Sequence, residues 1–87
     1  MSVEVIMYST RFCPYCVRAR QLLDRKCVAY TDIDVGGQAQ LRREMMQRSG
    51  QYTVPQIWIG DTHVGGYDDL AHLERQGALD TLLEQAS

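Results

Sequence analysis

The sequence predicts an α/β fold in which helices cover both faces of a four-stranded mixed sheet. Short β-branched segments alternate with longer helical ones in the order strand, helix, strand, helix, strand, strand, helix. A helix joins the first two strands, which should therefore be parallel, whereas a tight turn joins the last two into an antiparallel hairpin. With 87 residues, the chain has room for one domain, residues 1–87, with a modest core.

The first half of the chain predicts two strands and the helix between them. The first strand, Val3–Tyr8, is apolar on both faces apart from Glu4, so it should lie in the centre of the sheet. The first helix, Pro14–Lys26, begins with a proline, whose missing N–H costs nothing at that position. The second strand, Val28–Asp34, runs up to a pair of glycines.

The second half predicts the remaining elements between glycine-containing breaks. A second helix is predicted at Gln38–Arg48, before Ser49 and Gly50. The strands Val54–Ile59 and Thr62–Val64 should form the hairpin. A third helix is predicted from about Asp68 to Arg75, and a final helical turn or two carries Leu79, Leu82 and Leu83.

Composition narrows the classes of function. The net charge of −2 gives no reason to expect a nucleic-acid partner, and no run of 18 apolar residues predicts a membrane span. The N-terminus lacks the pattern of a signal peptide, so a cytoplasmic location is expected. Three cysteines are too few for a disulfide scaffold, and a reactive pair with one spare thiol fits a reducing compartment.

The segment Cys13-Pro14-Tyr15-Cys16 lies where the first strand gives way to the first helix. Two thiols at this spacing in a βαβ context are typical of a thioredoxin-like redox motif. With Cys13 at the N-cap, the free N–H groups of the first turn and the helix dipole stabilise negative charge on its sulfur. Cys16 lies one turn further on, on the face shared with Ala19 and Leu23, so it should be less exposed and should resolve a mixed disulfide formed at Cys13.

Two other readings of the cysteines carry less weight. A CxxC pair can be half of a zinc site, but zinc usually takes four ligands, and His63 and His72 are not at a short ligand spacing. Cys27 lies eleven residues beyond Cys16, roughly 16 Å along the helix axis, which is too far for a disulfide. An ordinary small residue at a helix exit is favoured there over a regulatory thiol.

Two further segments carry signals. In Thr53-Val54-Pro55-Gln56 the proline marks either a strand entrance or a cis peptide bond, and the residues alone do not decide between them. In Gly65-Gly66-Tyr67-Asp68-Asp69-Leu70, a tight turn leads into a helix N-terminus. Its acidic residues either cap the helix or, together with the helix amides, bind a zwitterionic amino acid end.

Together, these three segments resemble the dithiol glutaredoxins of bacterial type, across nearly the whole chain. The resemblance implies a thioredoxin-like fold and a glutathione-dependent thiol–disulfide oxidoreductase without a permanently bound cofactor. It would act as a monomer on glutathionylated or disulfide-containing proteins, with glutathione as reductant. By the same resemblance, Cys13 is the nucleophile and Cys16 the resolving thiol.

The resemblance also implies a glutathione groove. Val54, before a cis Pro55, would offer its backbone to the cysteine of glutathione, and Arg42 would reach the glycine carboxylate. The other residues implied in binding are Arg11, Tyr15, Thr53, Gly66, Tyr67, Asp68 and Asp69.

The chain departs from the family at three positions. Thr10 stands where many relatives have lysine, and Arg11 could supply that charge. Tyr67 replaces a frequent cysteine. Cys27 replaces a helix-ending glycine. If the backbone is left-handed there, a non-glycine residue carries roughly 1 kcal/mol of strain.

Two alternative functions stay open at this point. One is a carrier of a glutathione-ligated [2Fe–2S] cluster, which Pro14 disfavours by family resemblance. The other is a redoxin reduced by thioredoxin reductase, in which the sequence Trp-Cys-Gly-Pro-Cys would be usual.

Overall fold

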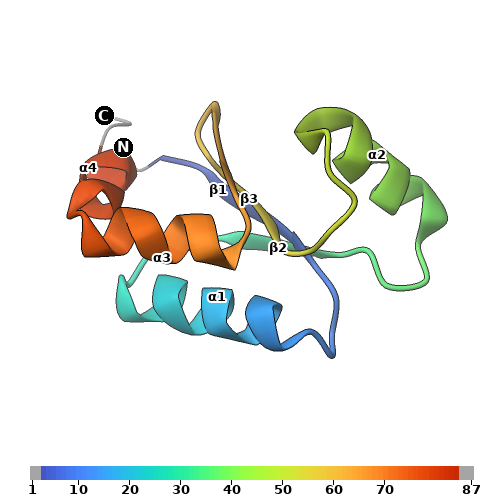
Figure 1. Cartoon of the computed structure of the whole chain (residues 1–87), viewed down its shortest axis with the longest axis horizontal. Helices are drawn as coiled ribbons and strands as arrows, with labels where there is room; N and C mark the ends of the chain where they lie inside the picture. Colours follow the sequence, from blue (N-terminus) through green and yellow to red (C-terminus); the bar gives the residue numbers. More distant parts are fainter. Residues whose placement is uncertain (1–2, 85–87) are drawn as a thin grey trace.

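The computed structural model describes residues 3–84, and its four-stranded sheet carries helices on both faces (Figure 1). The strands β1 (Val5–Ser9), β2 (Thr31–Asp34), β3 (Gln56–Ile59) and β4 (Thr62–Gly65) lie in the order β2-β1-β3-β4. β1 pairs parallel with β2 and antiparallel with β3, and β3 and β4 form an antiparallel hairpin. The predicted fold class, the mixed sheet and the central position of the first strand are confirmed.

Each face of the sheet has its own apolar core. The helices are α1 (Pro14–Arg25), α2 (Ala39–Ser49), α3 (Tyr67–Arg75) and α4 (Ala78–Glu84). Residues of α1, α3 and α4 pack with the buried side chains of β1 and β3 on one face. On the other face Met45 of α2 packs against Tyr8 and Trp58. Within residues 3–84, no helix has both the length and the apolar character needed to cross a membrane.

Three strands begin later than the sequence predicts, and the first of them, β1, begins at Val5 rather than at Val3. β3 begins at Gln56 rather than at Val54, because Pro55 has no N–H to donate to a neighbouring strand. β2 begins at Thr31, the partner of Ile6, although Val28 and Tyr30 before it still pack against the core. The apolar pattern therefore located these segments correctly. It did not show which of their residues pair with a neighbouring strand and which only bury their side chains.

The C-terminal end of α1 is tied to α3 and α4. Lys26 Nζ lies 2.6 Å from a carboxylate oxygen of Glu74 and 3.0 Å from one of Asp80. The next residue, Cys27, is exposed and has φ = 58°, in the left-handed region that favours glycine. The strain expected for a non-glycine residue at this helix exit, about 1–2 kcal/mol, therefore applies to Cys27.

Candidate functional site

Cys13 caps the N-terminus of α1. Its backbone is extended, Pro14 follows at the first helical position, and the Cys16 amide donates a hydrogen bond to the Cys13 sulfur over 3.4 Å. The side chain is partly exposed. Its thiol also lies 3.8 Å from the Val54 carbonyl oxygen, a weak hydrogen bond that links α1 to the segment before β3. Cys13 therefore combines solvent access with a helix amide directed at its sulfur.

Cys16 is far less exposed than Cys13. Its side chain is 0% exposed and lies on the same buried face of α1 as Ala19 and Leu23. Burial is the main reason why the pKa of the Cys16 thiol is raised to about 11, and the neighbouring Cys13 raises it further. Both thiols are free, so α1 carries an open dithiol. Within residues 3–84, no three metal-ligating side chains come together.

A hollow of about 380 Å³ lies beside the Val54 carbonyl oxygen. This volume is within the usual range for small-molecule sites. Three segments far apart in the sequence line it: the start of α1, the loop before β3, and the turn into α3. Eight of the ten predicted glutathione-binding residues line this hollow: Tyr15, Thr53, Val54, Pro55, Gly66, Tyr67, Asp68 and Asp69.

Two glycines shape the turn into α3 and its approach to the loop before β3. Gly65 has φ = 111°, and a Cβ there would lie 2.4 Å from a carboxylate oxygen of Asp69. That oxygen accepts a hydrogen bond from the Gly66 amide over 3.1 Å, so Asp69 caps α3 as one of the two sequence readings expected. A Cβ on Gly66 would lie 3.4 Å from the Pro55 carbonyl oxygen. The Val54–Pro55 bond is cis, as the family resemblance implied.

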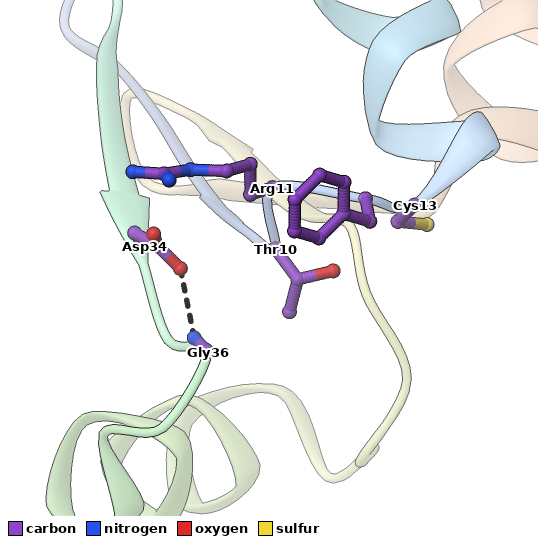
Figure 2. A pocket seen from close by; sticks show the side chains of 6 residues that line it. Thr10, Arg11, Cys13, Asp34 and Gly36 are labelled. Atoms are coloured by element: carbon purple, nitrogen blue, oxygen red, sulfur yellow. Dashed lines mark hydrogen bonds between the residues drawn. The ribbon is translucent and has the colours of Figure 1, made fainter.

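Arg11 lines a different hollow, of about 620 Å³, on the β2 side of Cys13 (Figure 2). Its side chain points away from the Cys13 sulfur, toward β2. Phe12, between the two, is 89% exposed. The structure therefore does not bring Arg11 to the hollow beside Val54, where the resemblance had implied a binding role for it.

Arg42 also lies outside that hollow. Its guanidinium donates to the Tyr52 carbonyl oxygen over 3.0 Å, and Arg42 lines another hollow together with Val35, Gly37, Gln38 and Ala39. Arg42 therefore holds the chain one residue before Thr53.

Sequence reasoning missed the residues that support the loop. Gln51 lines the hollow, and its position two residues before Thr53 was the available signal. Gln56 is fully buried and donates to the Thr53 carbonyl oxygen over 3.0 Å, while its side-chain oxygen lies 2.8 Å from His63 Nε2. The loop that carries Val54 is thus held from beneath by β3 and β4.

Comparison with known proteins identifies the family of this arrangement. The glutaredoxin family model matches residues 5–64. A glutaredoxin of Pseudomonas aeruginosa is 57% identical over 79 residues, which cover 91% of this chain and 94% of the relative.

Two solved structures are also similar. The solution structure of a glutaredoxin from Brucella melitensis is 50% identical, with a TM-score of 0.86 and coverage of 99% of this chain and 94% of the other. A crystal structure of a buckwheat glutaredoxin–glutathione complex is 30% identical, with a TM-score of 0.86 and coverage of 93% and 76%.

Proposed function

This chain belongs to the glutaredoxin family and is a glutathione-dependent thiol–disulfide oxidoreductase, and on this premise we propose that Cys13 is its nucleophile and Cys16 its resolving thiol. The observation that carries the proposal is the contrast between a partly exposed Cys13 that receives a helix amide and a fully buried Cys16 one turn away. A thiolate is the attacking species in disulfide exchange, and helix N–H groups favour it.

In the monothiol route, the Cys13 thiolate attacks the glutathione sulfur of a protein–glutathione disulfide. The protein leaves as a thiolate and takes up a proton, and Cys13 holds glutathione in a new disulfide. A second glutathione thiolate then attacks the bound glutathione sulfur. This releases oxidised glutathione and restores the Cys13 thiolate, so two electrons pass from glutathione to the protein substrate.

In the dithiol route, Cys13 attacks a protein disulfide and holds one half of it. The Cys16 thiolate then attacks the Cys13 sulfur, the second protein thiol leaves, and a Cys13–Cys16 disulfide forms. Two glutathione molecules reduce this disulfide. The cytoplasm is the proposed location, since glutathione keeps thiols reduced there, and the chain is proposed to act as a monomer.

The hollow beside Val54 is the proposed seat of glutathione. A buckwheat relative forms a complex with glutathione. The Val54 backbone would bind the glutathione cysteine as an added strand does, which would put the glutathione sulfur beside Cys13. The α3 N-terminus with Asp68 would receive the zwitterionic γ-glutamyl end, flanked by Tyr15 and Tyr67. Arg42, which lies outside this hollow and donates to the Tyr52 carbonyl oxygen, would meet the glycine carboxylate where glutathione extends beyond the hollow.

The test compares two variants on two substrates. Cys13→Ser should abolish reduction of both a glutathionylated peptide and a protein disulfide. Cys16→Ser should still turn over the glutathionylated peptide and should fail on the protein disulfide. Normal turnover of the glutathionylated peptide by Cys13→Ser would refute the assignment of the nucleophile.

A further inference from the structure

Arg20 on α1 joins three neighbouring segments through one side chain. Its Nε donates to an Asp32 carboxylate oxygen on β2 over 2.6 Å. Its Nη2 donates to the Ser9 hydroxyl at the end of β1 over 2.8 Å and to the Thr10 carbonyl oxygen over 3.2 Å. The Ser9 hydroxyl in turn donates to the other Asp32 oxygen. We refer to Arg20, Asp32, Ser9 and the Thr10 backbone as the Arg20 cluster.

Stability alone explains the Arg20 cluster poorly. The side chains of Arg20 and Asp32 are 25% and 30% exposed, and Ser9 is fully buried. Ion pairs taken partly out of water lose much of their attraction to the cost of desolvation. The cluster therefore invites a second role, and its position suggests one. Arg20 lies four residues after Cys16, one turn along the same side of α1.

The Cys16 sulfur needs help to carry negative charge. It is fully buried, and burial is the main cause that raises the pKa of its thiol. Two groups act in the opposite direction: the Thr10 backbone, by a hydrogen bond, and the positive charge of Arg20. Both belong to the Arg20 cluster, because Arg20 also holds the Thr10 carbonyl group.

The resolving step is the one that requires this charge. For Cys16 to attack, its proton must first leave to solvent. The Cys16 thiolate then attacks the Cys13 sulfur, the bond from Cys13 to glutathione breaks, and glutathione leaves as a thiolate that takes up a proton. Negative charge therefore exists on Cys16 only in this step. The first attack, by Cys13, has its own stabilising group in the Cys16 amide.

We propose that Arg20 is a positioning residue for the resolving step: Asp32 and Ser9 fix its guanidinium, and the guanidinium holds the Thr10 backbone beside Cys16. The proposal rests on the proposed role of Cys16 as the resolving thiol. It makes the Arg20 cluster specific to the dithiol route, because the monothiol route never ionises Cys16. The titratable groups around the cluster are Cys13, Cys16 and Tyr30, and Asp24 interacts with Tyr30.

The size of the effect follows from thiol chemistry. Each unit by which the pKa of Cys16 rises lowers its thiolate fraction tenfold at neutral pH. The thiolate becomes about threefold more nucleophilic, so the net loss in rate is about threefold per unit. Removal of the Arg20 charge should therefore slow resolution, by about threefold for each unit that the pKa of Cys16 rises.

The experiment follows a single resolution event. Reduced protein is mixed with one equivalent of a glutathionylated peptide, and release of glutathione from Cys13 with formation of the Cys13–Cys16 disulfide is measured by acid quench and mass spectrometry from pH 6 to 9. Arg20→Met should slow this step at each pH, and Arg20→Lys, which keeps the charge, should restore most of the rate. Arg25→Met, an equal loss of charge in the last turn of the same helix, is the matched control and should resolve at the normal rate.

Asp32→Asn separates positioning by charge from a purely structural role. This variant can still accept the Arg20 hydrogen bond but no longer neutralises its charge, so resolution should become faster. A purely structural cluster would instead make both Arg20→Met and Asp32→Asn slower. This opposite sign tests the proposal even if Arg20→Met proves too unstable to study.

Monothiol turnover in a Cys16→Ser background completes the design. Adding Arg20→Met there should change nothing. Resolution at the normal rate in Arg20→Met, or equal slowing of both routes, would overturn the role of Arg20. If Cys16→Ser itself still reduces protein disulfides, the assignment of the resolving thiol is wrong, which is a different failure.

Discussion

Cys13 and Cys16 lie three residues apart and have opposite surroundings. Cys13 is partly exposed, receives the Cys16 amide, lies 3.8 Å from the Val54 carbonyl oxygen and lines the hollow that also contains Arg11. Cys16 is fully buried against the sheet, where burial raises the pKa of its thiol to about 11. One turn of helix thus separates a thiol that can meet a substrate from one that can meet only its neighbour. The start of α1 alone is enough to distinguish the surroundings of the two thiols.

The largest expected difference is in alkylation. At pH 7, a thiol with a pKa of about 11 is ionised in only about one molecule in 10⁴, and Cys16 is also shielded from solvent. With iodoacetamide, Cys13 should therefore react at least about tenfold faster than Cys16. Trypsin cuts after Arg11 and Arg18, so one peptide reports both thiols, and fragment spectra separate them. Similar alkylation rates at the two thiols would contradict the proposed difference in exposure and ionisation between Cys13 and Cys16.

The resolving step should depend steeply on pH. Burial, the main cause of the raised pKa, also acts on Cys16 when Cys13 holds glutathione, so Cys16 should stay a neutral thiol through neutral pH and its thiolate fraction should grow about tenfold for each pH unit below that pKa. The rate of Cys13–Cys16 disulfide formation, followed by quenched flow, should rise accordingly between pH 7 and 9. A rate that levels off near pH 7 would mean that the folded protein does not raise the pKa of Cys16.

A substitution in the turn into α3 should weaken the reaction of Cys13 with a glutathionylated substrate and should leave the resolving step by Cys16 unchanged. Asp69→Ala removes the hydrogen bond to the Gly66 amide beside the hollow, which should destabilise the fold by about 1 kcal/mol. The KM for a glutathionylated peptide should rise, while the rate of resolution stays unchanged. Asp61→Ala, in the β3–β4 turn and outside the hollow, loses the same charge and should leave KM as it is. An unchanged KM in Asp69→Ala would argue against glutathione in this hollow.

The third cysteine provides the smallest expected effect. Cys27→Gly removes about 1–2 kcal/mol of left-handed strain and adds about 0.5–1 kcal/mol of backbone entropy cost. The Tm of thermal unfolding should therefore rise by a few degrees, and the rates of both redox routes should stay unchanged. Cys27→Ala, which keeps the strain, is the matched control for loss of the thiol. Lower activity in both variants would give Cys27 a role that its position at the far end of α1 does not suggest.

Local chemistry explains what the sequence could predict. The order of strands and helices, the burial of Cys16 and the cap at Cys13 follow from spacing within one segment, and the structure confirms them. The hollow required three segments to be recognised together, which the family resemblance supplied. The orientations of the Arg11 and Arg42 side chains could not be predicted from the sequence, because they depend on contacts that form only in the folded protein.

The Arg20 cluster illustrates the same limit. Asp32 lies twelve residues after Arg20 and Ser9 eleven before it, and only the pairing of β1 with β2 brings them together. In the sequence, Arg20 resembles any other basic residue on an exposed helix face. Contacts between strand ends and a helix therefore carry information that the motif itself does not contain.

The most direct measurement of the central claim is the site of glutathione attachment. Reduced wild type, Cys13→Ser and Cys16→Ser are each treated with oxidised glutathione, quenched with acid and digested with trypsin, and the peptide of residues 12–18 is sequenced by fragmentation. The assignment predicts glutathione on Cys13 in Cys16→Ser, no glutathione on Cys16 in Cys13→Ser, and an internal Cys13–Cys16 disulfide in wild type. Glutathione found on Cys16 in Cys13→Ser, at the rate seen for Cys13, would contradict it.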